Sequence, residues 1–192
     1  MSDEGRIYLD HNATSPLRRE AREEILRVLE STAANPSSLH AEGRAARAIV
    51  ERARDRVAEL AGAKPAEVVF TSGGSEAVAA AVRGVCDRAP NELRRIVVSE
   101  IEHSAVLESA ALAARRGFVV VKVPCNAQGR VKIDRFVMQL GDGVALAALQ
   151  WANNETGVIQ PVEEIGRACR ERGVPFLVDA VQAAGKIALE PK

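Results

Sequence analysis

The chain has 192 residues, of which 47% are apolar, and its 26 basic side chains balance 26 acidic ones. This composition suits one domain with a buried core, or a large part of a bigger protein. A net charge of zero gives no electrostatic reason to expect nucleic acid or an anionic membrane as a partner, and no apolar run is long enough to cross a bilayer.

The first third of the chain predicts a short strand and two helices. A strand-like run covers Ile7–Leu9, and apolar residues at helical spacing predict a helix over 16–29. An Asn-Pro pair and two serines predict a loop over 34–40. A longer amphipathic pattern predicts a second helix over 45–61, which Gly62 ends.

Strands and helices alternate from residue 67 onwards. Apolar, β-branched runs predict strands at 67–70, 95–98, 118–121, 144–149 and 175–178. Helical periodicity predicts helices at 76–85, 103–116 and 162–172. This alternation indicates an α/β domain with a largely parallel sheet and flanking helices.

The cysteines of the chain indicate neither a disulfide framework nor a metal site. Cys86, Cys125 and Cys169 lie far apart and form no C-x-x-C pair, which favours a reducing compartment. The acidic N-terminal segment leads into no apolar stretch, so no signal peptide is predicted. We therefore expect a cytoplasmic protein whose cysteines are small core residues.

Polar clusters follow the predicted strands. They cover residues 71–76, 100–104, 151–157 and 179–182. Ligands of open α/β sheets bind at the carboxyl ends of the strands. Each cluster has an ordinary alternative as a turn or a helix cap, so the indication of a shared ligand site comes from their common position.

Two of the clusters could bind a phosphate and an aromatic ring. Glycines before a helix, with Gly74 and Ser75, let backbone N–H groups and a hydroxyl approach an anion; the alternative is a glycine-rich turn with a serine cap. His103 could lie flat on an aromatic cofactor and move protons near neutral pH. The alternative for His103 is a helix-capping imidazole.

The other two clusters supply amides and an acid. Asn153 and Asn154 could bond a carboxylate or a phenolic oxygen, or could form a turn. Asp179 closes an apolar strand, where a carboxylate is costly without a cationic partner. A protonated pyridine nitrogen would be such a partner, which points to pyridoxal phosphate (PLP). The alternative is that Asp179 caps a helix and Gln182 is merely solvated.

Six segments of the chain resemble the cysteine desulfurases, in the class V aminotransferase group of fold-type I PLP enzymes. The segments are Tyr8–Pro16, Asn35–His40, Phe70–Gly73, Glu102–His103, Asn153–Gly157 and Asp179–Lys186. They run in order through essentially the whole chain. The Asn-Pro-Ser-Ser-x-His loop within them resembles that of enzymes that supply sulfur for iron–sulfur clusters and tRNA thiolation.

The resemblance implies a PLP-dependent transferase-like large domain with a mostly parallel sheet, incomplete at its C-terminus. Residues 1–15 would belong to the small domain, and residues 16–192 would form the N-terminal part of the PLP-binding large domain. Gly74 and Ser75 would bind the cofactor phosphate, although Ser75 stands where a threonine is usual. The chain therefore looks like an N-terminal half.

The remaining roles are also carried over by resemblance. His103 would stack on the pyridine ring and help to move protons. Asn154 would contact the substrate carboxylate or a cofactor oxygen. Asp179 would pair with the pyridine nitrogen, and Gln182 with the phenolic oxygen. No metal ligand is implied.

The function implied is PLP-dependent removal of sulfur from L-cysteine, giving L-alanine and a persulfide on the enzyme. None of the five lysines matches the one that holds the cofactor covalently, and the persulfide cysteine is also unmatched. The chain by itself would then be inactive, and its partners would be a sulfur acceptor or iron–sulfur scaffold protein and either a second copy or a complementary C-terminal chain. The alternatives are another class V enzyme, such as a selenocysteine lyase or an aminotransferase, and a non-catalytic partner or regulatory fragment.

Overall fold

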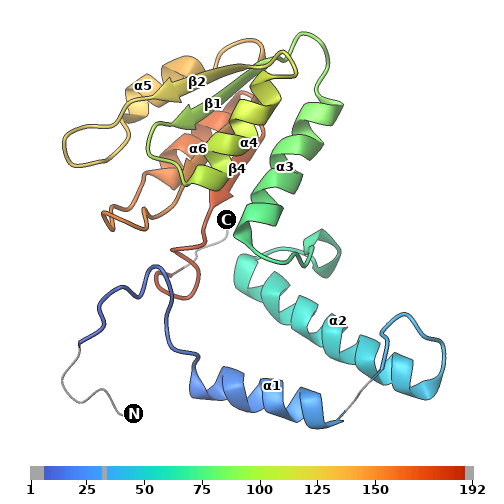
Figure 1. Ribbon diagram of the computed structural model, residues 1–192. Helices are drawn as coiled ribbons and strands as arrows, with labels where there is room; N and C mark the ends of the chain where they lie inside the picture. Colours follow the sequence, from blue (N-terminus) through green and yellow to red (C-terminus); the bar gives the residue numbers. More distant parts are fainter. Residues whose placement is uncertain (1–6, 32–33, 189–192) are drawn as a thin grey trace. The chain divides into compact units, whose positions relative to one another are not determined.

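The computed structural model describes residues 7–31 and 34–188. These residues form two compact units that divide between Phe70 and Thr71. Each unit has its own elements, shown in Figure 1. Among the helices of the described ranges, none is long and apolar enough to cross a membrane.

The first unit is helical. It contains α1 (Arg19–Ser31), α2 (Ala41–Ala61) and a 3₁₀ turn, η1 (Pro65–Glu67). Both predicted helices are confirmed. Helix α1 begins later than the predicted range 16–29, and α2 begins earlier than the predicted range 45–61. The start of α2 at Ala41 follows from His40, whose Nδ1 accepts the N–H of Gly43 at 3.3 Å. Gly62 ends the helix in the left-handed conformation, with φ of 60°, which a glycine adopts without strain.

Two predicted strands of this unit are wrong. Ile7–Leu9 has no regular structure. In the range 67–70, the first residue is the last residue of η1, and the other three have no regular structure. Hydrogen bonds to side chains replace strand pairing there: the Glu67 carboxylate accepts from the N–H of Lys64 at 2.8 Å, and the Val68 carbonyl accepts from Arg54 at 2.5 Å. An apolar run becomes a strand only where another strand supplies its hydrogen-bond partners.

The second unit contains a four-stranded parallel sheet. Its strands are β1 (Arg95–Ser99), β2 (Val119–Val123), β3 (Val144–Gln150) and β4 (Phe176–Asp179), in the order β2-β1-β3-β4. The other four predicted strands and the parallel sheet are thereby confirmed. Every residue of β3 is buried, because this central strand has helices on both of its faces.

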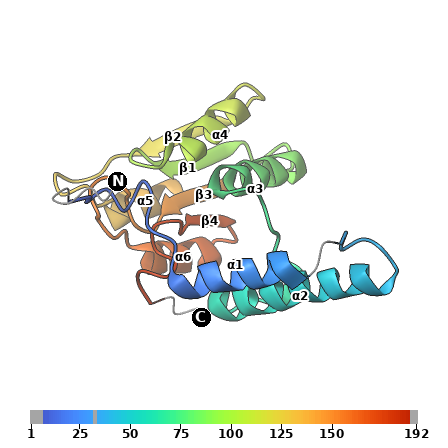
Figure 2. The ribbon, with the colours of Figure 1, turned by 60° about the horizontal axis from the view of Figure 1, so that its bottom comes forward.

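The helices of the second unit form two layers around the sheet (Figures 1 and 2). On one face lie α3 (Gly74–Arg88) and α4 (Ser104–Ala114); on the other lie α5 (Ile133–Gln139) and α6 (Val162–Glu171). Successive side chains of a strand point to opposite faces of the sheet, so the core is divided between the two helix layers. Ile96 and Val98 pack in the α3–α4 cluster, whereas Val97 packs in the α5–α6 cluster. The short helix α5, with Phe136 fully buried, was not among the predicted elements.

The cysteines are part of this core. Cys86 and Cys169 are buried, and Cys125 packs against the α5–α6 cluster, which confirms the prediction of small core residues. Burial raises the pKa of Cys125 and of Cys169 to about 11, so both remain thiols at neutral pH. Within the described part of the chain, no group of three or more His, Cys, Asp or Glu side chains could hold a metal ion.

Candidate functional site

The carboxyl ends of the four strands lie at one edge of the sheet. In the parallel register Ser99 of β1 pairs with Val123 of β2, and Gln150 of β3 pairs with Asp179 of β4. The loops after β1, β3 and β4 contain three of the predicted polar clusters. Parallel pairing therefore places these clusters at the same edge, as expected for a ligand site of an α/β sheet.

Hydrogen bonds join these loops to one another. The carbonyl of Ile101, after β1, accepts from the side-chain amide of Gln150 and from that of Asn153, the latter at 3.3 Å. The N–H of Trp151 donates to the carbonyl of Asp179 at 2.8 Å. The loops after β1 and β3 and the end of β4 are thus held as one connected edge.

The start of α3 belongs to the same edge. A Cβ atom on Gly74, the first residue of α3, would lie 2.9 Å from Cγ2 of Val181, which follows β4. Ser75 is exposed in the first turn of the helix, where unsatisfied N–H groups attract an anion. The Glu76 carboxylate accepts from the hydroxyl of Ser72 at 2.6 Å and from its N–H at 2.7 Å, and these bonds lower the pKa of Glu76.

His103 is the N-cap of α4 and is exposed. Its Nδ1 accepts the N–H of Ala105 at 3.2 Å, which is the capping role that the sequence left as the alternative. A neutral ring that accepts at Nδ1 carries its proton at Nε2. Capping therefore fixes the orientation of the imidazole and leaves Nε2 as the atom that could exchange a proton with a ligand.

The two adjacent asparagines have different environments. Asn153 is buried, and its Oδ1 accepts from the N–H of Glu155 at 2.9 Å and from the N–H and hydroxyl of Thr156 at 2.8 and 3.0 Å. Its amide also donates to Ile101. Asn153 thus uses its polar atoms to build the loop, whereas Asn154 is only half-buried at the same edge.

Asp179 and Gln182 are both half-buried at the end of β4 and in the turn that follows. Oδ1 of Asp179 accepts the N–H of Val181 at 3.0 Å, and Oε1 of Gln182 accepts from Nζ of Lys186 at 2.5 Å. A half-buried carboxylate at the ligand edge of the sheet is a suitable partner for a cationic group of a ligand.

Glu102 was not predicted as a site residue. It is only 6% exposed, between β1 and α4, and the Ser99 hydroxyl donates to its Oε1. Desolvation, together with a smaller effect of the charge of Asp179, raises the pKa of Glu102 to about 7. The sequence shows an acid after a strand, but nothing in it distinguishes a buried acid from a solvated one such as Glu100.

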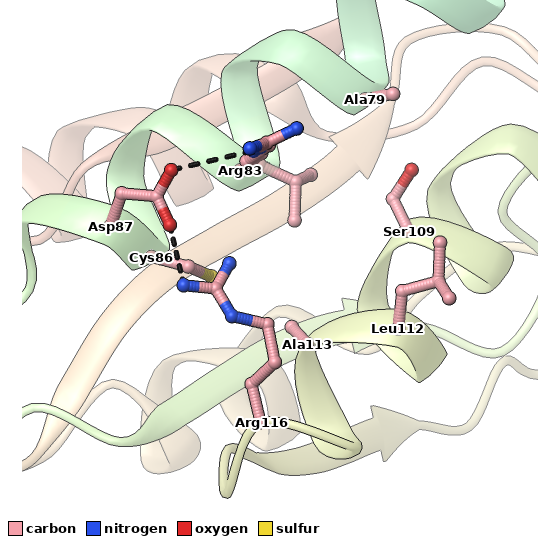
Figure 3. A pocket seen from close by; sticks show the side chains of 9 residues that line it. Ala79, Arg83, Cys86, Asp87, Ser109, Leu112, Ala113 and Arg116 are labelled. Carbon is pink, nitrogen blue, oxygen red and sulfur yellow. Dashed lines mark hydrogen bonds and ion pairs between the residues drawn. The ribbon is translucent and has the colours of Figure 1, made fainter.

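A groove of about 440 Å³ lies elsewhere, between α3 and α4. Figure 3 shows Arg83 and Arg116 turned toward Asp87, which they contact at 3.5 and 2.5 Å, above the buried Cys86. The lining residues of this groove come from the middle and the C-terminal halves of the two helices, away from the N-termini that lie at the strand ends. Its charged groups already pair with one another, so it is not the candidate site.

Residues 7–192 match a family described as "Aminotransferase class-V". A protein of Trichormus azollae named "Cysteine desulfurase" is 42% identical over 97% of this chain and 46% of its own length. An "IscS-like cysteine desulfurase" of Mycobacterium tuberculosis is 43% identical over 95% of this chain and 48% of its own length.

Solved structures share this fold over nearly the whole chain. A "NIFS-LIKE PROTEIN" superposes with a TM-score of 0.92 at 34% identity, over 96% of this chain and 51% of that one. "SspA in complex with cysteine" has a TM-score of 0.88 at 31% identity, over 95% and 53% of the two chains. The chain spans about half the length of the curated relatives it matches.

Proposed function

Since the chain belongs to the class V aminotransferase family, we propose that it forms part of the cofactor site of a PLP-dependent cysteine desulfurase. The names of its relatives support this reaction. The observation that carries the proposal is the connected edge, where Asp179, the loops after β1 and β3, and the start of α3 converge.

The donor set at this edge fits PLP. The cofactor has a phosphate, a ring nitrogen that can be cationic and a phenolic oxygen. The exposed first turn of α3, with Gly74 and Ser75, suits the phosphate. The Asp179 carboxylate suits the ring nitrogen, and the amides of Asn154 and Gln182 suit the phenolic oxygen or a substrate carboxylate. When bound, PLP supplies an electron sink for the substrate carbons.

The residues of this chain would bind, orient and protonate. Asp179 would keep the ring nitrogen protonated, because a nearby carboxylate favours the cationic form. The exposed imidazole of His103 would stack on the ring, with Nδ1 engaged in capping and Nε2 left to hold or release a proton. The covalent lysine and the persulfide thiol are not assigned to any of residues 7–188.

The proposal extends to the whole protein. Residues 1–15 would belong to a small domain, and residues 16–192 to the PLP-binding large domain. L-cysteine would be the substrate, and a sulfur acceptor or iron–sulfur scaffold protein the partner. The protein would act as a homodimer, or with a complementary C-terminal chain, in the cytoplasm.

We expect Asp179→Asn to lower turnover of L-cysteine by about 100-fold or more, the scale of losing a preorganised electrostatic group. Ser75→Ala should mainly weaken PLP binding, because one hydrogen bond to a charged group contributes about 1.5–3 kcal/mol. The measurements are alanine and sulfide production by the assembled enzyme, in which the covalent lysine and the persulfide thiol are also present, and an absorbance titration with PLP.

Asp142→Asn is the matched control, because Asp142 is exposed just before β3, at the opposite edge of the sheet. This variant should retain full activity. Equal losses of activity in Asp179→Asn and Asp142→Asn would contradict the assigned role. A keto acid as the product, in place of alanine, would identify an aminotransferase instead.

A further inference from the structure

The Glu102 side chain combines burial with an incomplete set of partners. It is 6% exposed, and its Oε1 accepts from Ser99, itself fully buried at the end of β1. Its Oε2 is buried and finds no hydrogen-bond partner among the residues that the structure describes. An ionised carboxylate in this position would be costly, because half of its charge would lack a donor.

The loop around Glu102 is fixed in place. The carbonyl of Ile101 accepts hydrogen bonds from Gln150 and Asn153, so the residue before Glu102 is tied to the end of β3. The residue after it, His103, caps α4. With both neighbours held, Glu102 keeps its buried position, where a proton on its carboxyl relieves the cost of burial.

Besides His103, which follows it in the chain, titratable groups on three segments lie near Glu102. Asp179 lies at the end of β4, and its charge raises the pKa of Glu102. Cys125, after β2, senses the charges of Glu100 and Glu102, but burial raises the pKa of its thiol to about 11, so it stays neutral. Glu100 is exposed, and its carboxylate accepts the N–H of Cys125 at 2.7 Å. Asp179, at the end of β4, is thus the charge that acts on Glu102.

Burial distinguishes the two acids. Asp179 is only half-buried, and its Oδ1 accepts the backbone N–H of Val181 at 3.0 Å. Glu102 is desolvated and has one unpartnered oxygen, which favours its neutral form.

We propose that Glu102 is a positioning residue for the candidate site: its buried carboxyl holds a proton, and this leaves Asp179 as the carboxylate available to a cationic ring nitrogen. The identity of that ring as PLP rests on the proposed function. The protonation of Glu102 rests on its burial and on the missing partner of its Oε2.

Infrared difference spectroscopy on the purified protein without added PLP tests the proton directly. The spectrum of the wild type minus that of Glu102→Gln should contain the C=O band of a protonated carboxyl, which disappears with a midpoint near pH 7. In Asp179→Asn the midpoint should move to lower pH, because the like charge is gone. A missing band at pH 6, or a midpoint that Asp179→Asn leaves unchanged, would overturn the proposal.

Two further variants keep the test independent of the folding of Glu102→Gln. Ser99→Ala removes the hydroxyl that lowers the pKa of Glu102, so the midpoint should rise. Glu100→Gln is the matched control on the same loop and should leave both the band and its midpoint unchanged. Loss of the band in Glu100→Gln would show that the protonated carboxyl is Glu100 and not Glu102, and would refute the proposal.

Addition of PLP separates this inference from the proposed function. If the ring nitrogen binds at Asp179, its positive charge should lower the midpoint of the Glu102 band. An unchanged or raised midpoint, with PLP bound by the criterion of its absorbance, would refute the link between Glu102 and the ligand. Failure of the protein to bind PLP would refute the proposed function while the titration of the apo-protein still stands.

Discussion

Glu102 and Asp179 are acids at the same edge of one sheet, but Glu102 is buried whereas Asp179 is half-buried. Glu102 is 6% exposed, and its pKa is raised from 4.5 to about 7, first by desolvation and then by the charge of Asp179. A carboxyl whose pKa is higher in the folded than in the unfolded state destabilises the fold once the unfolded chain has ionised. Burial of Glu102 therefore lowers stability near neutral pH.

We expect Glu102→Gln to stabilise the protein above pH 7 by about 3 kcal/mol, because a shift from 4.5 to about 7 corresponds to that free energy. Below pH 4.5 both states are protonated and the gain should vanish. The destabilisation of the wild type thus develops as the pH rises from 4.5 to about 7 and then levels off. Denaturant unfolding of both proteins at several pH values measures it.

Glu100→Gln is again the control, because substitution of the exposed Glu100 should change the free energy of unfolding only slightly. If Glu102→Gln gave the same change in unfolding free energy at pH 4 as at pH 8, the difference would come from packing rather than from a proton. The raised pKa of Glu102 would then be wrong.

At the scale of elements, the start of α3 and the turn after β4 depend on each other at Gly74. A Cβ atom there would lie 2.9 Å from Cγ2 of Val181, closer than two carbon atoms tolerate. Gly74→Ala should therefore move the turn away from the helix and cost about 1–3 kcal/mol, as overpacking does. It should also weaken PLP binding, since the two segments carry the proposed phosphate and ring contacts.

Gly84→Ala provides a matched comparison within α3. A Cβ atom at Gly84 meets nothing within 4 Å, so the better helix propensity of alanine should stabilise the protein by up to about 1 kcal/mol. The same substitution is thus expected to lower the free energy of unfolding at Gly74 and to raise it at Gly84, as measured by thermal or denaturant unfolding. A stabilising Gly74→Ala would show that the helix and the turn do not constrain each other.

The sheet unit as a whole has three layers, a sheet between two layers of helices. Each face of the sheet therefore packs in its own apolar cluster. Val106 of α4 lies in one cluster, and Ile165 of α6 lies in the other with Phe136 of α5. Ile165→Val should cost about 1 kcal/mol and Val106→Ala about 2 kcal/mol. Their combination should be additive to within about 0.5 kcal/mol, since the two residues share no partners.

Phe136→Leu combined with Ile165→Val is the contrasting pair. Both residues belong to the same cluster, so their effects should deviate from additivity by about 0.5–3 kcal/mol. Denaturant unfolding of the single and double variants gives the two coupling energies. A larger coupling across the sheet, between Val106 and Ile165, than within the α5–α6 cluster would argue against the separation into layers.

Much of the sheet unit follows from local pattern. The apolar runs 95–98, 118–121, 144–149 and 175–178 all became strands, because continuous β-branched and apolar runs with helices between them have few other ways to bury their side chains. The position of the polar clusters at the strand ends followed in turn from the parallel sheet. Helix α5 escaped prediction because its seven residues are too few to give a clear period.

The sequence by itself determined the class of fold, the parallel sheet and the edge at which a ligand site would form, since periodicity and residue order are properties of the chain alone. Only the tertiary structure decided that Glu102 is buried, that Asn153 rather than Asn154 builds its loop, and that Ile7–Leu9 and 67–70 are not strands. The reason is physical: desolvation, hydrogen-bond partners and strand pairing all come from residues distant in sequence.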